Sequence, residues 1–105
     1  TRQILLSGVP FSAMFIVSYE MAIGAMAALY DNGLKIPDDV SIVGFDDIDY
    51  AQFCRPKLTT VHQPIYKTGV IACELLLKLI RGEKIPACTT IEAELVIRDS
   101  VKNIK

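Results

Sequence analysis

At 105 residues, the chain is long enough for one domain and too short for two, because domains mostly run from about 50 to 250 residues. Hydrophobic residues make up 51% of it, against about 45–50% in an average soluble domain. The formal net charge is −1, and the lysines and arginines are scattered along the chain. This excludes the basic patch of a nucleic-acid or membrane-surface binder, so we expect one domain that contacts neither by itself.

The N-terminal segment, from Ile4 to Tyr19, carries no charge. It is shorter than the roughly 20 apolar residues of a membrane-spanning helix and is interrupted by Gly8 and Pro10, so we interpret it as core. Because the chain opens on Thr1 rather than Met, we expect it to be an incomplete fragment of a longer protein.

Short apolar runs alternate with helical patterns, which favours an α/β fold with a mainly parallel sheet. Ala13 to Val17 is predicted to be a strand covered on both faces. Ser18 then follows as the N-cap of a helix from Met21 to Tyr30, with Glu20 in the first turn. This helix is expected to end at Asn32-Gly33.

Two further buried strands are predicted, at Val40 to Phe45 and Thr59 to His62, the first ending at Asp46-Asp47 and the second at Gln63-Pro64. Pro64 suits the first position of the next helix, which we expect to end near Arg81.

That helix has a single polar stripe, and its other sides are apolar, so it is expected to have partners on more than one side. The last predicted strand, Ile91 to Ile97, alternates apolar residues with Glu92, Glu94 and Arg98. This alternation is typical of a half-exposed edge strand.

Polar side chains stand at three predicted strand ends: Ser18, Asp46 and Gln63. Ligands of open α/β sheets bind outside the carboxyl ends of the strands, and a hydroxyl, a carboxylate and an amide together suit a polyhydroxylated or amide-bearing ligand. On spacing alone, the favoured alternative is that these residues only cap a helix, form a turn and precede a proline.

Catalytic interpretations have less support. Neighbouring carboxylates such as Asp46 and Asp47 usually diverge, whereas a general acid and base must converge on one bond. His62 is the only histidine, and no glycine-rich phosphate loop is present. The three cysteines, Cys54, Cys73 and Cys88, form no C-x-x-C pair and are interpreted as buried free thiols of a cytoplasmic protein. We therefore predict no enzyme, no cofactor and no metal site.

Three segments together resemble the C-terminal half of transcriptional regulators of the lactose/galactose repressor (LacI/GalR) family. They are S-Y-E-M-A-I-G-A-M at 18–26, D-N-G-L-K-I-P-D-D-V-S-I-V-G-F-D-D-I at 31–48 and P-K-L-T-T-V-H-Q-P at 56–64. The resemblance spans nearly the whole chain.

The resemblance implies a parallel-sheet, three-layer lobe of a periplasmic-binding-protein-like type I fold, here an incomplete fragment. Residues 1–63 and 88–105 would form the C-terminal lobe, and residues 64–87 would supply a helix that crosses over to pack on an absent N-terminal lobe. It further implies a homodimer that binds a small-molecule effector of the sugar class and reaches operator DNA only through an absent N-terminal domain.

For the site, the resemblance implies that Asp46 contacts effector and that Gln63 lines the cleft. Ser18 and Tyr19 stand where the family usually has Asn-Asp, so a shorter hydroxyl replaces an amide that commonly contacts effector. The family's dimer surface maps to Ile23 and to the loop that contains the residues Tyr50, Phe53 and Cys54.

Two alternatives to a regulator are a periplasmic sugar-binding receptor of the same fold and an α/β enzyme that uses Asp46. The sequence upstream of Thr1 separates the first from a regulator, because a receptor would have a signal peptide and a regulator a helix-turn-helix. Turnover of a substrate would identify the enzyme.

Overall fold

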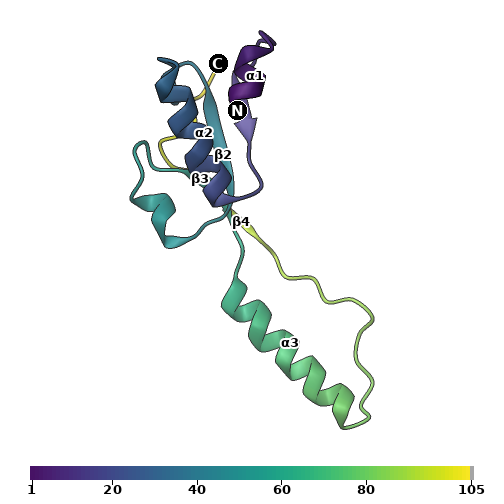
Figure 1. Ribbon diagram of the computed structural model, residues 1–105. Helices are drawn as coiled ribbons and strands as arrows, with labels where there is room; N and C mark the ends of the chain where they lie inside the picture. Colours follow the sequence, from purple (N-terminus) through teal and green to yellow (C-terminus); the bar gives the residue numbers. More distant parts are fainter. Residues whose placement is uncertain (105) are drawn as a thin grey trace. The chain divides into compact units, whose positions relative to one another are not determined.

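The computed structural model describes residues 1–104 and divides into two compact units. The first unit contains Thr1–His62 and the segment that starts at Glu94, and the second is Gln63–Ala93 (Figure 1).

The first unit is built on one four-stranded sheet in the order β1-β2-β3-β4. Its strands are β1 (Ala13–Phe15), β2 (Ser41–Asp46), β3 (Thr59–His62) and β4 (Glu94–Val96). The pairs β1–β2 and β2–β3 are parallel, and β3–β4 is antiparallel. The predicted α/β fold with a mainly parallel sheet is therefore confirmed.

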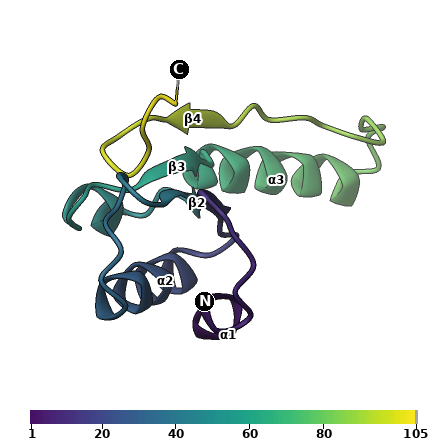
Figure 2. The same cartoon turned by 90° about the horizontal axis from the view of Figure 1, so that it is seen from above.

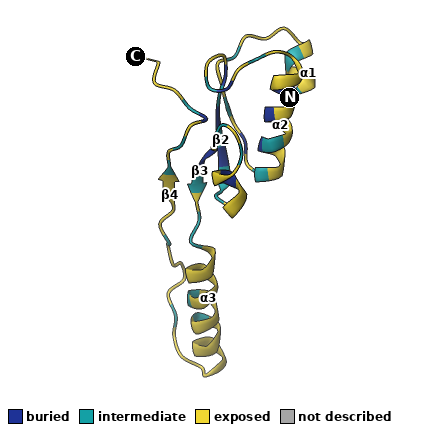
Figure 3. Ribbon diagram, turned by 90° about the vertical axis from the view of Figure 1, so that its left-hand side faces the viewer, coloured by how far each residue is buried: buried dark blue, intermediate teal, exposed yellow. Residues whose placement is uncertain are grey.

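Two helices, α1 (Arg2–Leu6) and α2 (Tyr19–Asp31), lie on the same side of the sheet (Figure 2), and a 3-10 helix, η1 (Asp49–Gln52), follows β2. The buried side of α2 is a helical stripe of small and apolar residues that packs against β2. With residues of the strands and loops it forms one core, coloured dark blue in Figure 3, whose buried members are Ile16, Ala22, Ala25, Met26, Leu29, Ile36, Val40, Ile42, Ala51 and Leu58.

The prediction for helix α2 needs one small correction at its start. Ser18 has extended backbone angles and is the N-cap, as predicted, but the helix starts directly after it at Tyr19 rather than at Met21. Its C-cap is Asn32, followed by Gly33 with a φ of 74°, so the predicted end is confirmed.

Strand β1 is less covered than the sequence suggested. It pairs with β2 alone among the described strands, and Phe15 is 61% exposed, so the expectation of a strand covered on both faces is wrong for this chain. The charge-free segment around it was also expected to be core, but Ile16 is its one buried residue, and the unpredicted helix α1 buries none. An edge strand has neighbours on one side only, which leaves its apolar residues exposed.

The C-terminal segment is tied to the sheet by Ser100, which is fully buried. Its hydroxyl donates to the Ile42 carbonyl at 2.6 Å and accepts the Thr59 N–H at 2.8 Å. The backbone carbonyl of Ser100 accepts the N–H of Ile42 at 2.8 Å. One residue therefore links β2, β3 and the chain after β4, a role that the sequence pattern did not indicate.

The second unit consists of helix α3 (Ile65–Ile80) and the loop that follows it. Pro64 is the N-cap, and Gly82, with a φ of 76°, stops the helix as predicted. No residue of α3 is buried, and it exposes many large apolar side chains: Ile65, Tyr66, Val70, Leu76, Leu77, Leu79 and Ile80. The cysteines were expected to be buried, but Cys73 and Cys88 in this unit are exposed, and Cys54 in the first unit is half-buried.

We predict that Ser100→Ala lowers the free energy of unfolding by about 1–3 kcal/mol, because the Thr59 N–H and the Ile42 carbonyl lose a buried partner. The control is Ser7→Ala, which removes an exposed hydroxyl bonded to Ile4 and should cost less than about 0.5 kcal/mol. Urea denaturation of the chain measures both. Equal midpoints for the two variants would contradict the linking role of Ser100.

Candidate functional site

The carboxyl end of β2 carries two successive aspartates in an uncommon backbone conformation. Asp46 has a φ of 82° and Asp47 a φ of 45°, and both values lie in the left-handed region that few residues other than glycine adopt. Aspartate is among the side chains that tolerate this region best. Asp46 is the last residue of β2 and is in register with His62, the last residue of β3.

The Asp47 carboxylate lies between two nitrogen-bearing side chains at this end of the sheet. Its Oδ1 lies 2.7 Å from Arg98 Nη1, and its Oδ2 lies 3.2 Å from His62 Nδ1. The Asp47 N–H donates to Thr60 Oγ1 at 3.3 Å. The Asp47 side chain is only 12% exposed, and a carboxylate so buried requires opposite charge and hydrogen bonds around it.

Arg98 continues this network toward β3. Its guanidinium, the ion-pair partner of Asp47, donates a hydrogen bond to the Leu58 carbonyl, and its backbone N–H donates to Thr59 Oγ1, both at 2.8 Å. The alternating pattern had placed Arg98 on the exposed side of the last strand, which is wrong, because its side chain is 18% exposed. Strand β4 ends at Val96, so Arg98 lies beyond the strand, and the alternation of exposed and buried side chains along β4 does not apply to it.

Ser18 uses its hydroxyl within its own helix. The hydroxyl donates to Glu20 Oε2 at 2.7 Å rather than capping a backbone N–H of α2. This hydrogen bond is the largest cause that lowers the pKa of Glu20 below its ordinary value, and a backbone hydrogen bond to Glu20 adds to the effect.

Tyr19 belongs to an aromatic patch, which we define as Tyr19, Tyr50 and Phe53. The Tyr19 and Tyr50 rings are tilted with centroids 6.1 Å apart, and Tyr50 and Phe53 are edge-to-face at 6.4 Å. Desolvation raises the pKa of the Tyr19 phenol, and the neighbouring Cys54, Tyr50 and Glu20 add to that effect.

The expected dimer residues are thus gathered around one of the expected effector residues. Tyr50 and Phe53 are 65% and 66% exposed, whereas Ile23 and Cys54 are half-buried and pack against the core. A second aromatic pair, Phe15 and Phe45, is edge-to-face at 6.2 Å beside Asp46 and was not singled out from the sequence.

Gln63 lies in the second unit, at its first position. Its backbone carbonyl accepts the Ile65 N–H at 2.8 Å, which makes it part of the turn into α3. Its place beside Asp46 in one site stays a prediction.

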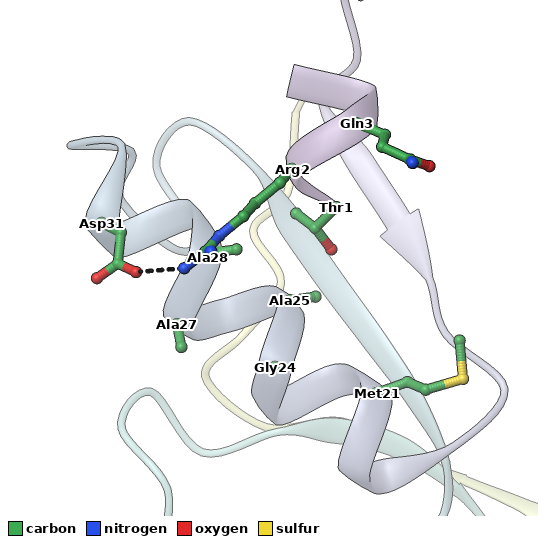
Figure 4. A pocket seen from close by; sticks show the side chains of 9 residues that line it. All are labelled: Thr1, Arg2, Gln3, Met21, Gly24, Ala25, Ala27, Ala28 and Asp31. Atoms are coloured by element: carbon green, nitrogen blue, oxygen red, sulfur yellow. Dashed lines mark hydrogen bonds and ion pairs between the residues drawn. The ribbon is translucent and has the colours of Figure 1, made fainter. Parts of the chain in front are cut away.

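A hollow of the first unit lies elsewhere, between α1 and α2. It has a volume of about 480 Å³ and is lined by Thr1, Arg2, Gln3, Met21, Gly24, Ala25, Ala27, Ala28 and Asp31 (Figure 4). Its one ion pair joins Arg2 and Asp31 at 3.5 Å, with both side chains largely exposed. None of the predicted site residues lines it.

Among residues 1–104, no group of three or more His, Cys, Asp and Glu side chains is arranged to hold a metal ion. Within the same residues, every helix is too short or too polar to cross a bilayer.

A mainly parallel sheet with polar residues at its carboxyl ends defines the class of α/β ligand-binding domains. Residues 3–101 match the model of the periplasmic binding protein-like domain, so the chain belongs to that family. It is 42% identical over 96 residues to the probable HTH-type transcriptional repressor ExuR of Bacillus subtilis (strain 168), covering 90% of this chain and 29% of that protein. With the HTH-type transcriptional repressor CytR of Escherichia coli (strain K12) it shares 44% identity over 94 residues, covering 89% and 28%.

Solved structures give the same result. A lac repressor dimer bound to operator and the anti-inducer ONPF matches with a TM-score of 0.90 and 32% identity, over 94% of this chain and 35% of that one. A sugar-binding LacI-family regulator from Escherichia coli, complexed with phosphate, matches with a TM-score of 0.85 and 34% identity, over 95% and 36%. The resemblance to LacI/GalR regulators is confirmed, and the chain spans less than a third of the curated relatives' length.

We predict that Ser18→Ala raises the pKa of Glu20 toward its ordinary value, because the carboxylate loses its main donor. A folded-state pKa below the unfolded one contributes stability above the unfolded pKa that is lost as the pH falls, so the variant should lose less stability on acidification. Carboxyl NMR shifts of Glu20 across pH 2–7 measure the change, with Ser18→Thr as the hydroxyl-retaining control. An unchanged pKa of Glu20 in Ser18→Ala would show that the Ser18 hydroxyl does not donate a hydrogen bond to Glu20.

Proposed function

We propose that the chain is the effector-binding and dimerisation portion of a DNA-binding transcriptional repressor that responds to a small molecule of the sugar class. The observation that carries the proposal is the Asp46-Asp47 turn at the carboxyl end of a parallel strand, in a chain whose relatives are named transcriptional repressors. Contact with operator DNA would come from a domain outside this chain, in the cytoplasm. No catalytic role is proposed for any residue.

In this proposal Asp46 accepts hydrogen bonds from effector hydroxyl or amide groups. The neighbouring Asp47 is held by Arg98 and His62, and Asp46 lies half-buried at the end of β2. The adjacent Phe15–Phe45 pair adds an apolar surface, and sugar rings have both apolar faces and hydroxyl edges. Ser18, Tyr19 and Gln63 are assigned to the effector site from the resemblance.

We further propose that the aromatic patch, with Ile23 and Cys54 beneath it, is the homodimer surface. Exposed aromatic residues beside half-buried apolar ones are typical of the centre of a subunit interface. The lac repressor that matches this fold is a dimer in its crystal structure.

The second unit is proposed to serve another lobe of the same protein. Residues 1–63 and 88–105 would belong to the C-terminal lobe, and residues 64–87 would carry α3 to the N-terminal lobe. The exposed apolar residues of α3 support this, since such a surface rarely stays exposed on a stable domain.

A periplasmic sugar-binding receptor is the second candidate, because the matching family takes its name from periplasmic binding proteins. Curated relatives that share 40–44% identity with this chain are nevertheless named as transcriptional repressors, which favours the regulator. The sequence upstream of Thr1 in the gene decides between a helix-turn-helix and a signal peptide.

We expect Asp46→Ala in the full-length protein to weaken effector binding at least about tenfold, because donors of the effector lose a charged acceptor. Calorimetric titration with hexoses, pentoses, sugar phosphates and purines measures this. Ser18→Asn should instead change which of these compounds binds best, because a longer amide replaces the hydroxyl. The control is Asp49→Ala, an exposed aspartate in η1. Unchanged affinity in a folded Asp46→Ala variant would remove Asp46 from the site.

For the dimer surface, Phe53→Asp in the full-length protein should give monomers, because burying an unpaired carboxylate at a two-fold interface costs several kcal/mol. Ile23→Asp should do the same, but Ile23 also packs on the core, so Phe53 is the cleaner test. Sedimentation equilibrium measures the association, and Val9→Asp, at another exposed apolar residue, is the control. A Phe53→Asp protein that stays as dimeric as wild type would show that the interface lies elsewhere.

A further inference from the structure

We propose that Asp47 and Arg98 form a positioning pair that holds the backbone of Asp46 in the conformation with which it meets effector. The proposal rests on the proposed role of Asp46. It adds that two residues which do not contact effector determine where the effector-binding carboxylate points.

The backbone of the Asp46-Asp47 turn is strained. Two successive left-handed residues other than glycine are unfavourable and persist where surrounding contacts enforce them. Without such contacts, Asp46 would relax to a more common conformation, and its carboxylate would leave the position it has at the end of β2.

The contacts that enforce this conformation are made by Asp47. Asp47 is anchored through three separate partners, namely Thr60 Oγ1, His62 Nδ1 and Arg98 Nη1. Thr60 is buried in β3, and Arg98 is itself fixed to the Leu58 carbonyl. The turn after β2 is therefore attached through one residue, Asp47, to β3 and to the chain that follows β4.

The two aspartates have different roles in this proposal. Both carboxylate oxygens of Asp47 face a nitrogen, Oδ1 that of Arg98 at 2.7 Å and Oδ2 that of His62 at 3.2 Å. With the side chain 12% exposed, Asp47 has little surface to offer a ligand. It therefore acts on effector through Asp46, as a positioning residue.

The test compares four variants of the full-length protein: Asp47→Asn, Arg98→Met, the double variant with both changes, and Arg98→Lys. Asp31→Asn is the matched control, because it breaks the exposed Arg2–Asp31 pair in the same unit. Three quantities are measured for each: the urea midpoint, the amide hydrogen exchange of residues 46–48, and the affinity for the hexose, pentose, sugar phosphate or purine that wild type binds most tightly.

We expect Asp47→Asn and Arg98→Met each to speed amide exchange at residues 46–48 and to weaken binding about tenfold. Arg98→Lys keeps the charge and should retain part of the affinity. The double variant leaves no unpaired buried charge, so its midpoint should return toward wild type while its affinity stays low. Asp31→Asn should change neither exchange at 46–48 nor affinity.

A double variant that recovers affinity together with stability would overturn the proposal, because the pair would then be only structural. Unchanged exchange at residues 46–48 in Asp47→Asn would also overturn it. If wild type binds none of the compounds, or if Asp46→Ala binds them as wild type does, the proposed function fails instead. The exchange measurement still decides in that case whether the pair holds the Asp46 turn.

Discussion

Because β1 pairs in parallel with β2, and β2 with β3, the carboxyl ends of these three strands all lie at one edge of the sheet. Residues of the first unit at these strand ends are thereby carried to the same edge, however far apart they are in sequence. Asp46 and His62 are brought into register in this way across 16 positions of the chain. The site depends on the parallel pairing before it depends on any single side chain.

That pairing requires close packing between the strands and the residues that cover them. A Cβ atom on Gly44 would lie 2.8 Å from Leu58 Cδ2, so β2 needs a glycine where the Leu58 side chain crosses it. In the same core, α2 approaches β2 through Ala22 and Ala25, whose small side chains allow the helix to lie close. The buried Ser100 then joins the chain after β4 to both central strands.

The central elements could be predicted from the sequence because their signals are local. The apolar runs of β2 and β3, the N-cap at Ser18 and the stop at Gly82 each depend on a few neighbouring residues. The same local signals located Asp46 at a strand end.

Apart from the start of α2, the main errors concern properties that depend on distant neighbours. Whether β1 is covered depends on what lies beside it in the sheet, and its residues alone do not encode that. The roles of Asp47, Arg98 and Ser100 arise from contacts across 13 to 58 positions of sequence, such as Asp47 to Thr60 and Ser100 to Ile42. A period-two pattern could only describe Arg98 as exposed, because it contains no information about the Asp47 carboxylate in the turn after β2.

Ser18 and Tyr19 show how closely the two proposed surfaces are connected in this fold. They are consecutive residues at the point where β1 gives way to α2, yet the Tyr19 ring lies against Tyr50 of the proposed dimer surface. Ser18 is held in the first turn of the same helix by its hydrogen bond to Glu20. A shift of the α2 N-terminus would therefore move a proposed effector residue and a proposed dimer contact together, because one rigid helical turn carries both.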